Sequence, residues 1–171
     1  MCIRDSAYKV VGDSPTQDYA VLRVLLAIFW RAHALDLVES YAGNNWEDFD
    51  WPEWFDDLRD QLVSEKRDDV VLDYLEGFEE RFDLLSPTAP FMQVADLHTK
   101  SGATKPVSFI VPEAADDFFT MRTAEGRESL APDEAARWLI HAQAFDYSGI
   151  KSGAEGDPRV KGGRGYPIGT G

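Results

Sequence analysis

At 171 residues, with 44% apolar and 12% aromatic side chains, the chain is the size of one domain and can bury a core, which excludes disorder of the whole chain. The single cysteine, Cys2, excludes an internal disulfide, and no histidines stand near it at zinc-ligand spacing. The longest apolar run, residues 24–30, is too short to cross a bilayer, and no secretory leader opens the chain. We therefore expect a soluble, cytoplasmic protein with no membrane contact.

The charge of the chain is strongly acidic but unevenly distributed. Seventeen Lys and Arg against 31 Asp and Glu give a net charge of −14, which argues against a nucleic-acid partner because cations bind phosphates. Residues 1–150 carry a net −16, whereas residues 151–171 carry a net +2. One end of an acidic body is therefore locally basic.

The first six residues, MCIRDS, carry no secondary-structure signal and resemble translated adapter sequence. Residues 166–171 stop inside a glycine-rich stretch without a capping element, so we expect a piece of a longer polypeptide. The predicted organisation is a non-native leader over 1–6, a core over 7–147 and a glycine-rich basic loop over 148–171.

Two long helices are predicted in the first half of the chain. Ser14 is a good N-cap, the next residue is proline, and Gln17 is placed to complete a capping box. Apolar residues then cover more than one face up to residue 37, as in a buried helix. Asp50 and Glu53 form a second capping-box pattern, followed by apolar residues spaced three and four apart.

A third apolar repeat predicts a helix over residues 70–85, and Pro132 opens a fourth that reaches residue 145. Between them, the short apolar runs 89–94 and 107–111 read as strands, because Pro, Gly, Ser and Thr bracket them. Eight of the 13 glycines fall in residues 149–171, which predicts a loop. The predicted fold class is α+β, mostly helical, with a few short strands and a glycine-rich tail.

The glycine-rich tail does not match a phosphate-binding motif. A P-loop needs a Lys followed by Ser or Thr at the start of a helix, and a dinucleotide fingerprint needs its glycines between a strand and a helix. Here Tyr166 and Pro167 follow the glycines. Glycines still let backbone amides approach a ligand, and nearby cations favour phosphate, so nucleic-acid or anion contact stays open beside an inert flexible loop.

No catalytic arrangement emerges from the sequence. His33 and His141 fall within predicted helices beside apolar neighbours, which favours a structural role, and His98 has no obvious partner. Carboxylate pairs within 47–50 and 76–83 could act as acid and base, but their helical periodicity assigns them to solvent. No Ser, His and Asp set stands in a nucleophile-elbow context. We expect no enzyme, no metal and no cofactor.

Two adjacent rings, Phe118 and Phe119, precede the polar segment 120–129, which contains Arg122 and Arg127. Either both rings belong to the core, or one is exposed and can stack on a base.

Several short blocks occur in a fixed order along the chain. They are residues 89–93 (APFMQ), 118–123 (FFTMRT), 135–139 (AARWL), 144–153 (AFDYSGIKSG) running into 156–159 (GDPR), and 166–171 (YPIGTG). In this order and spacing, the series resembles the large subunit of the type I-E CRISPR surveillance complex, CasA of Cascade. The resemblance covers residues 14–171.

The resemblance implies a non-catalytic subunit of an RNA-guided complex. The family reads a short motif beside the target in duplex DNA (the PAM), helps start unwinding, and provides a landing surface for the helicase-nuclease. The implied partners are the other Cascade subunits, the 5′ handle of the guide CRISPR RNA and the target double-stranded DNA. The family's glycine loop, which lies against the minor groove at the PAM, would correspond to Gly162, Gly163, Arg164 and Gly165.

A second family feature is a mobile loop that contacts the 5′ handle and the PAM region. It would begin at Phe119 and continue over residues 120–129, with Arg122 and Arg127 as its cations. An acidic body repels DNA except where basic residues collect, so further contacts would come from the tail residues Lys151, Arg159 and Lys161. The minor groove offers a degenerate hydrogen-bond pattern, so a bare glycine backbone could read it by shape.

The sequence also departs from the family. Family members have strands before the first long helix and continue past the glycine loop into the rest of an α/β domain and a helical bundle. The alternative is an acidic protein-interaction domain without a nucleic-acid role, whose helices present carboxylates to a basic partner and whose tail is a linker.

Overall fold

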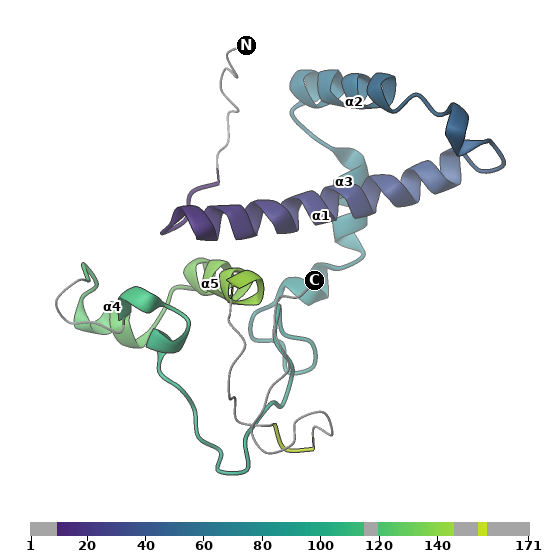
Figure 1. The fold of residues 1–171 in the computed structure, drawn as a ribbon. Helices are drawn as coiled ribbons and strands as arrows, with labels where there is room; N and C mark the ends of the chain where they lie inside the picture. Colours follow the sequence, from purple (N-terminus) through teal and green to yellow (C-terminus); the bar gives the residue numbers. More distant parts are fainter. Residues whose placement is uncertain (1–9, 115–119, 146–153, 157–171) are drawn as a thin grey trace. The chain divides into compact units, whose positions relative to one another are not determined.

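The structure, a computed structural model, describes residues 10–114, 120–145 and 154–156 (Figure 1). Within these residues the chain is helical. Its α-helices are α1 (Pro15–Ser40), α2 (Trp51–Glu65), α3 (Asp69–Glu76), α4 (Ala124–Glu128) and α5 (Pro132–Phe145). Short 3₁₀ helices lie between them: η1 (Trp46–Asp48), η2 (Glu79–Phe82), η3 (Val107–Phe109) and η4 (Pro112–Ala114).

The chain divides into two compact units. Unit 1 comprises the described residues up to Val24 and from Glu80 onward, and unit 2 is Leu25–Glu79. The boundary falls inside α1, so this helix contributes its first turns to unit 1 and its remainder to unit 2.

The predicted α+β fold with short strands is wrong, because no strand forms anywhere in the described ranges. The predicted strand over 107–111 is instead η3, in which the N–H of Ile110 donates to the carbonyl of Val107 at 3.0 Å. The predicted strand over 89–94 forms turns, with the N–H of Gln93 bonded to the carbonyl of Pro90 at 3.1 Å. Pro90 within the first run and prolines on either side of the second remove ladder donors, and local turns form hydrogen bonds without a partner strand.

The third predicted helix is shorter than the apolar pattern suggested. Instead of spanning 70–85, α3 ends at Glu76, and Gly77 serves as its C-cap. The N–H of Phe78 then donates to the carbonyl of Leu75 at 2.9 Å, which tightens the last turn before η2. Glycine disfavours continuation because it loses more backbone entropy in a helix than any other residue.

Unit 1 is organised around the start of α1 and around α5. The predicted cap at α1 is confirmed, since Ser14 Oγ accepts from the N–H of Gln17 at 3.2 Å. The side chain of Gln17 is fully buried. Its Oε1 accepts from the N–H of Asp13 at 2.9 Å, not from the N–H of Ser14 as in a standard capping box. The small core of this unit comprises Val111, Ala114 and Trp138, with Val107, Ile110 and Leu130 packed against it.

Unit 2 is held by helix caps and one buried polar contact. Asp50 Oδ1 accepts from the N–H of Glu53 at 3.0 Å, which confirms the predicted start of α2. Asp68 caps α3 through its Oδ1, which accepts from the N–H of Val71 at 3.0 Å. Its second oxygen lies 3.0 Å from Nε2 of His33, a buried residue of α1. The Asp68 carboxylate therefore caps the N-terminus of α3 and also contacts His33 of α1.

Candidate functional site

Only two of the predicted site residues, Arg122 and Arg127, lie in the part of the chain that the structure describes. The others lie outside the described residues: Phe119, Lys151, Arg159, Lys161, Gly162, Gly163, Arg164 and Gly165. The geometry of the candidate site is therefore that of segment 120–129 and the elements it contacts.

Segment 120–129 begins with irregular backbone over residues 120–123 and continues into the short helix α4. The hydroxyl of Thr120 accepts from the N–H of Arg122 at 3.0 Å. At the other end, the N–H of Ser129 donates to the carbonyl of Glu125 at 3.0 Å and its hydroxyl donates to the same oxygen at 3.1 Å. A helix this short is marginal without tertiary support, so its contacts with other elements hold it in place.

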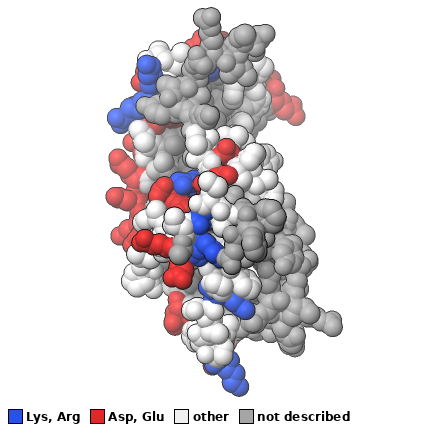
Figure 2. Space-filling model, turned by 90° about the vertical axis from the view of Figure 1, so that its left-hand side faces the viewer, with Lys and Arg blue, Asp and Glu red and all other residues white. Residues whose placement is uncertain are grey.

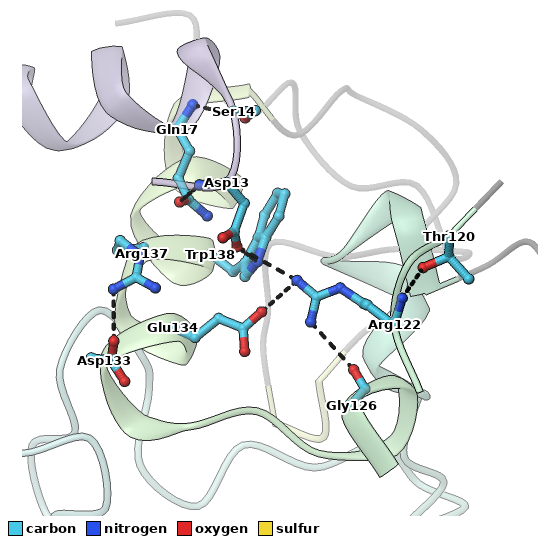
Figure 3. Close-up of polar contacts among 10 residues, drawn as sticks. All are labelled: Asp13, Ser14, Gln17, Thr120, Arg122, Gly126, Asp133, Glu134, Arg137 and Trp138. Atoms are coloured by element: carbon cyan, nitrogen blue, oxygen red, sulfur yellow. Dashed lines mark hydrogen bonds and ion pairs between the residues drawn. The ribbon is translucent and has the colours of Figure 1, made fainter. Parts of the chain in front are cut away.

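The Arg122 side chain provides that support (Figure 3). Its Nη2 pairs with Glu134 Oε1, in the first turn of α5, and lies 3.5 Å from Asp13 Oδ2, just before α1. Its Nη1 donates to the carbonyl of Gly126, inside α4, at 3.3 Å. The Arg122 side chain is only 14% exposed, and the Glu134 side chain only 19%. One guanidinium thus ties the start of α1, α4 and α5 together.

Asp13 connects the Arg122 side chain to the core of unit 1. Its Oδ2, which pairs with Arg122, also accepts from the indole N–H of Trp138 at 3.0 Å. Trp138 is 3% exposed and belongs to the core with Val111 and Ala114. The guanidinium, the carboxylate and the buried indole form a continuous polar chain, which we call the Arg122 cluster: Asp13, Arg122, Glu134 and Trp138.

The side chains around Arg122 differ in exposure. Arg127, in the last turn of α4, is half-buried, whereas Met121 is completely exposed and Thr123 is exposed. On either side of the mostly buried Arg122, the neighbouring residues thus project into solvent. The Arg122 guanidinium is paired with carboxylates, and phosphate contact by Arg122 or Arg127 stays a prediction.

Other described arginines also lie beside carboxylates. Arg59 Nη1 is 2.8 Å from Asp56, Arg67 pairs with Asp69, and Arg137 Nη1 is 2.8 Å from Asp133 on α5. The last pair lowers the pKa of Asp133, chiefly because its carboxylate accepts a hydrogen bond from Arg137. One face of the molecule shows basic side chains near the middle of the view with acidic ones beside them and along one edge (Figure 2). Such surface pairs add little stability, but they reduce the positive charge available to phosphate.

The beginning of the tail contacts another loop through His98. The N–H of Glu155 donates to the carbonyl of His98 at 2.9 Å, and Glu155 Oε2 is 3.4 Å from His98 Nε2. A hydrogen bond between the ring and the backbone of Asp96, together with the two carboxylates, raises the pKa of His98. No local sequence signal links His98 to these partners.

The other two histidines occupy structural positions, as expected. His33 is buried against Asp68, and its ring centroid is 4.5 Å from that of Phe29. His141 Nε2 lies 3.2 Å from the hydroxyl of Thr16, and burial lowers its pKa. Among the described residues, no group of three or more His, Cys, Asp or Glu is arranged to hold a metal ion, and no helix there is long and apolar enough to span a membrane.

Sequence reasoning missed the partners of Arg122. In the sequence, Asp13 directly precedes the predicted cap Ser14, and Glu134 and Trp138 lie within the helix predicted to begin at Pro132. Asp13 and Arg122 are 109 residues apart, and Asp13 and Trp138 are 125 apart. No local sequence pattern links residues so far apart in the chain.

Comparisons with known proteins decide the family. The family model for the CRISPR-associated protein Cse1 matches residues 2–171. This chain belongs to the Cse1 family. A curated relative, the CRISPR-associated protein CasA/Cse1 of Thermus thermophilus, is 30% identical over 146 residues, which cover 83% of this chain and 26% of that protein.

Two solved Cse1 structures share the fold. Cse1 of Thermobifida fusca matches with a TM-score of 0.63 and 44% identity over 94% of this chain and 28% of that one. Cse1 of Acidimicrobium ferrooxidans matches with a TM-score of 0.58 and 30% identity over 93% of this chain and 26% of that one. The chain thus spans about a quarter of the length of these Cse1 relatives.

Proposed function

We propose that the protein serves as the non-catalytic large subunit of a type I-E CRISPR RNA-guided surveillance complex in the cytoplasm. In that role it contributes to PAM recognition in duplex DNA, to target unwinding and to recruitment of the helicase-nuclease. The observation that carries this proposal is the match of the Cse1 family model over residues 2–171, joined by the ordered sequence blocks. Its partners would be the other Cascade subunits, the guide RNA 5′ handle and the target DNA.

Within this role, we assign DNA contact to the glycine-rich tail. Gly162, Gly163, Arg164 and Gly165 would lie against the minor groove, where an unsubstituted backbone can approach closely. The nearby cations Lys151, Arg159 and Lys161 would hold the phosphate backbone. The rest of the chain is acidic, so it would discourage binding elsewhere on the protein.

We assign contact with the guide RNA handle and the PAM region to the loop that begins at Phe119 and continues through segment 120–129. The anchoring of this segment by the Arg122 cluster supports the assignment, because a contact loop on a fixed base loses less conformational entropy on binding. Arg127, half-buried at the end of α4, lies on the same anchored segment.

The test is PAM-dependent DNA binding by the reconstituted complex. The protein encoded by the intact gene is assembled with the guide-bearing subunits, and its affinity is measured for duplexes with and without the PAM. We expect Gly163→Asp to weaken PAM-dependent binding by about tenfold or more, because it adds bulk and negative charge against the groove. Ala103→Asp, which adds the same charge in an exposed loop of unit 1, is the matched control and should bind like the wild type.

Equal affinity of the wild-type complex for both duplexes would contradict the proposed function. Unchanged binding by Gly163→Asp would remove the glycine tail from the model while leaving the subunit assignment intact.

A second candidate function is a docking domain for a basic protein, and one observation favours it. Unit 2 contains 15 Asp and Glu but only four Lys and Arg, so this unit alone has a net charge of −11. Such a surface would bind a cationic partner whether or not guide RNA is present. Binding that persists in the absence of guide RNA, and a gene without neighbouring CRISPR subunits or a repeat array, would favour this alternative.

A further inference from the structure

The immediate surroundings of the Arg122 guanidinium are negative. Asp13 and Glu134 both pair with its Nη2, and the carbonyl of Gly126 accepts from its Nη1. The side chain is 14% exposed, so most of its length is screened from solvent. A phosphate that approached this group would have to displace two carboxylates, at the cost of their ion pairs with Arg122, or lie beside them against like-charge repulsion.

The contacts of Arg122 join parts of unit 1 that are far apart in sequence. Asp13 precedes α1, Gly126 is inside α4, and Glu134 is in the first turn of α5 (Figure 3). Asp13 is in turn fixed by the indole of Trp138, which is a core residue. A guanidinium suits this task, because its planar fork offers several donors in fixed directions. The arrangement is therefore built to hold segment 120–129 on the body of the unit.

The same arrangement determines which side chains of the segment reach solvent. Thr120 and Arg122 are turned at least partly inward, whereas Met121 is completely exposed and Thr123 is exposed. Thr123 has extended backbone, with φ −70° and ψ 167°. Fixing the Arg122 guanidinium inward therefore leaves an exposed side chain on each side of it, Met121 and Thr123.

We propose that Arg122 is a positioning residue: its pairing with Asp13 and Glu134 holds segment 120–129 so that Met121 and Thr123 face the nucleic acid, and its guanidinium contacts no phosphate. This inference rests on the proposed function of the segment. It replaces the expectation that Arg122 itself binds nucleic acid.

The two roles predict opposite effects of removing the Arg122 partners. Glu134→Gln and Asp13→Asn remove a negative charge next to Arg122 with little change in shape. A phosphate-binding Arg122 would be released by these changes and would bind nucleic acid more tightly. A positioning Arg122 would lose its anchor, so the affinity of the protein for the guide-bearing complex should fall by about fivefold or more. Asp133→Asn is the matched control, since Asp133 is the preceding residue of α5, pairs with Arg137 and is 73% exposed.

The salt dependence of binding gives a second readout that a change in stability alone would not move. Loss of a phosphate contact lowers the slope of log affinity against log salt by about 0.7 to 0.9. We expect Arg122→Gln to weaken binding while the slope stays at the wild-type value. Met121→Ala should weaken binding severalfold while the melting temperature stays unchanged, because the side chain is completely exposed.

Tighter binding by Glu134→Gln, or a smaller salt slope in Arg122→Gln, would overturn the positioning role and leave the proposed function standing. Wild-type binding that does not depend on guide RNA would instead overturn the proposed function, and this inference with it. Thermal unfolding of each variant, measured on the same samples, shows whether the protein is folded.

Discussion

Unit 1 and unit 2 are stabilised in different ways. Unit 1 has an enclosed core around Trp138, and the sequence outside residues 25–79 is close to neutral, with 16 acidic and 13 basic residues. Unit 2 has a net charge of −11, and its buried residues are Ala32, His33 and Leu37, all on α1. The contrast shows that one chain can place its hydrophobic core and its acidic charge in separate parts, so the two parts should respond differently to substitution.

The apolar residues of unit 2 are used in ring-to-ring contacts near the surface. Trp46 and Trp51 stack with centroids 6.1 Å apart, and Phe49 packs edge-on against Trp51 at 4.6 Å. Trp46 and Trp51 are nevertheless 40% and 45% exposed. A groove of about 620 Å³, lined by residues of α1 and α2 that include Trp30 and Phe55, lies on the same unit. Each ring pair contributes modestly, because much of the apolar surface remains in contact with water.

The largest effect should come from removing the indole at the centre of unit 1. Trp138→Ala deletes a side chain that is 3% exposed and also frees Asp13, so we expect the free energy of unfolding to fall by about 3–5 kcal/mol. Trp51→Ala in unit 2 is the matched substitution and should cost about 1 kcal/mol, since that ring is half exposed. Chemical denaturation of both variants checks the difference, and equal losses would show that the two units share one kind of packing.

An intermediate effect is expected at the buried polar contact of unit 2. Asp68→Ala removes the N-cap of α3 and leaves His33 buried without its carboxylate, so it should cost roughly 2 kcal/mol. Asp68→Asn keeps an oxygen for the cap and another polar atom for the imidazole, so its loss should be less than half of that. Thermal unfolding of the two variants separates the roles, and an equal loss would mean that the negative charge, rather than the hydrogen bonds, is what matters.

The smallest effects concern two histidines of unit 1 that should respond to pH with opposite signs. The pKa of His98 is raised above its ordinary value of 6.5, so its contribution to stability is full below pH 6.5 and is lost as pH rises through the raised pKa. Burial lowers the pKa of His141, so its contribution is full above pH 6.5 and is lost as pH falls through the lowered pKa.

These signs can be read from the difference in melting temperature between variant and wild type across pH 5 to 8. His98→Gln should be less stable than wild type at the acidic end and approach it at the basic end. His141→Gln should show the reverse, with its deficit largest at the basic end. If the difference in melting temperature varied with pH in the same direction for both variants, the opposite pKa shifts of His98 and His141 would be contradicted.

Helix starts could be predicted because their signals are local. Ser14, Asp50 and Pro132 each stand within three residues of the groups that they affect, and the observed helices begin at all three places. The third helix was predicted to extend to residue 85 but ends at Glu76. The apolar periodicity continues past Gly77, whereas the helical backbone stops there. The short apolar runs were misread as strands because a run of five or six residues fits a strand or a tight turn equally well.

The sequence by itself determined where the long helices begin, the acidic charge of residues 25–79, and the ordered blocks that mark the Cse1 family. Only the tertiary structure decided that residues 107–109 form a 3₁₀ helix whose Val107 packs against the core of unit 1, and that Arg122 pairs with Asp13 and Glu134. The reason is physical. Caps and periodicity act over a few residues, whereas the partner of a charged side chain depends on which distant segments the folded chain brings within hydrogen-bonding distance.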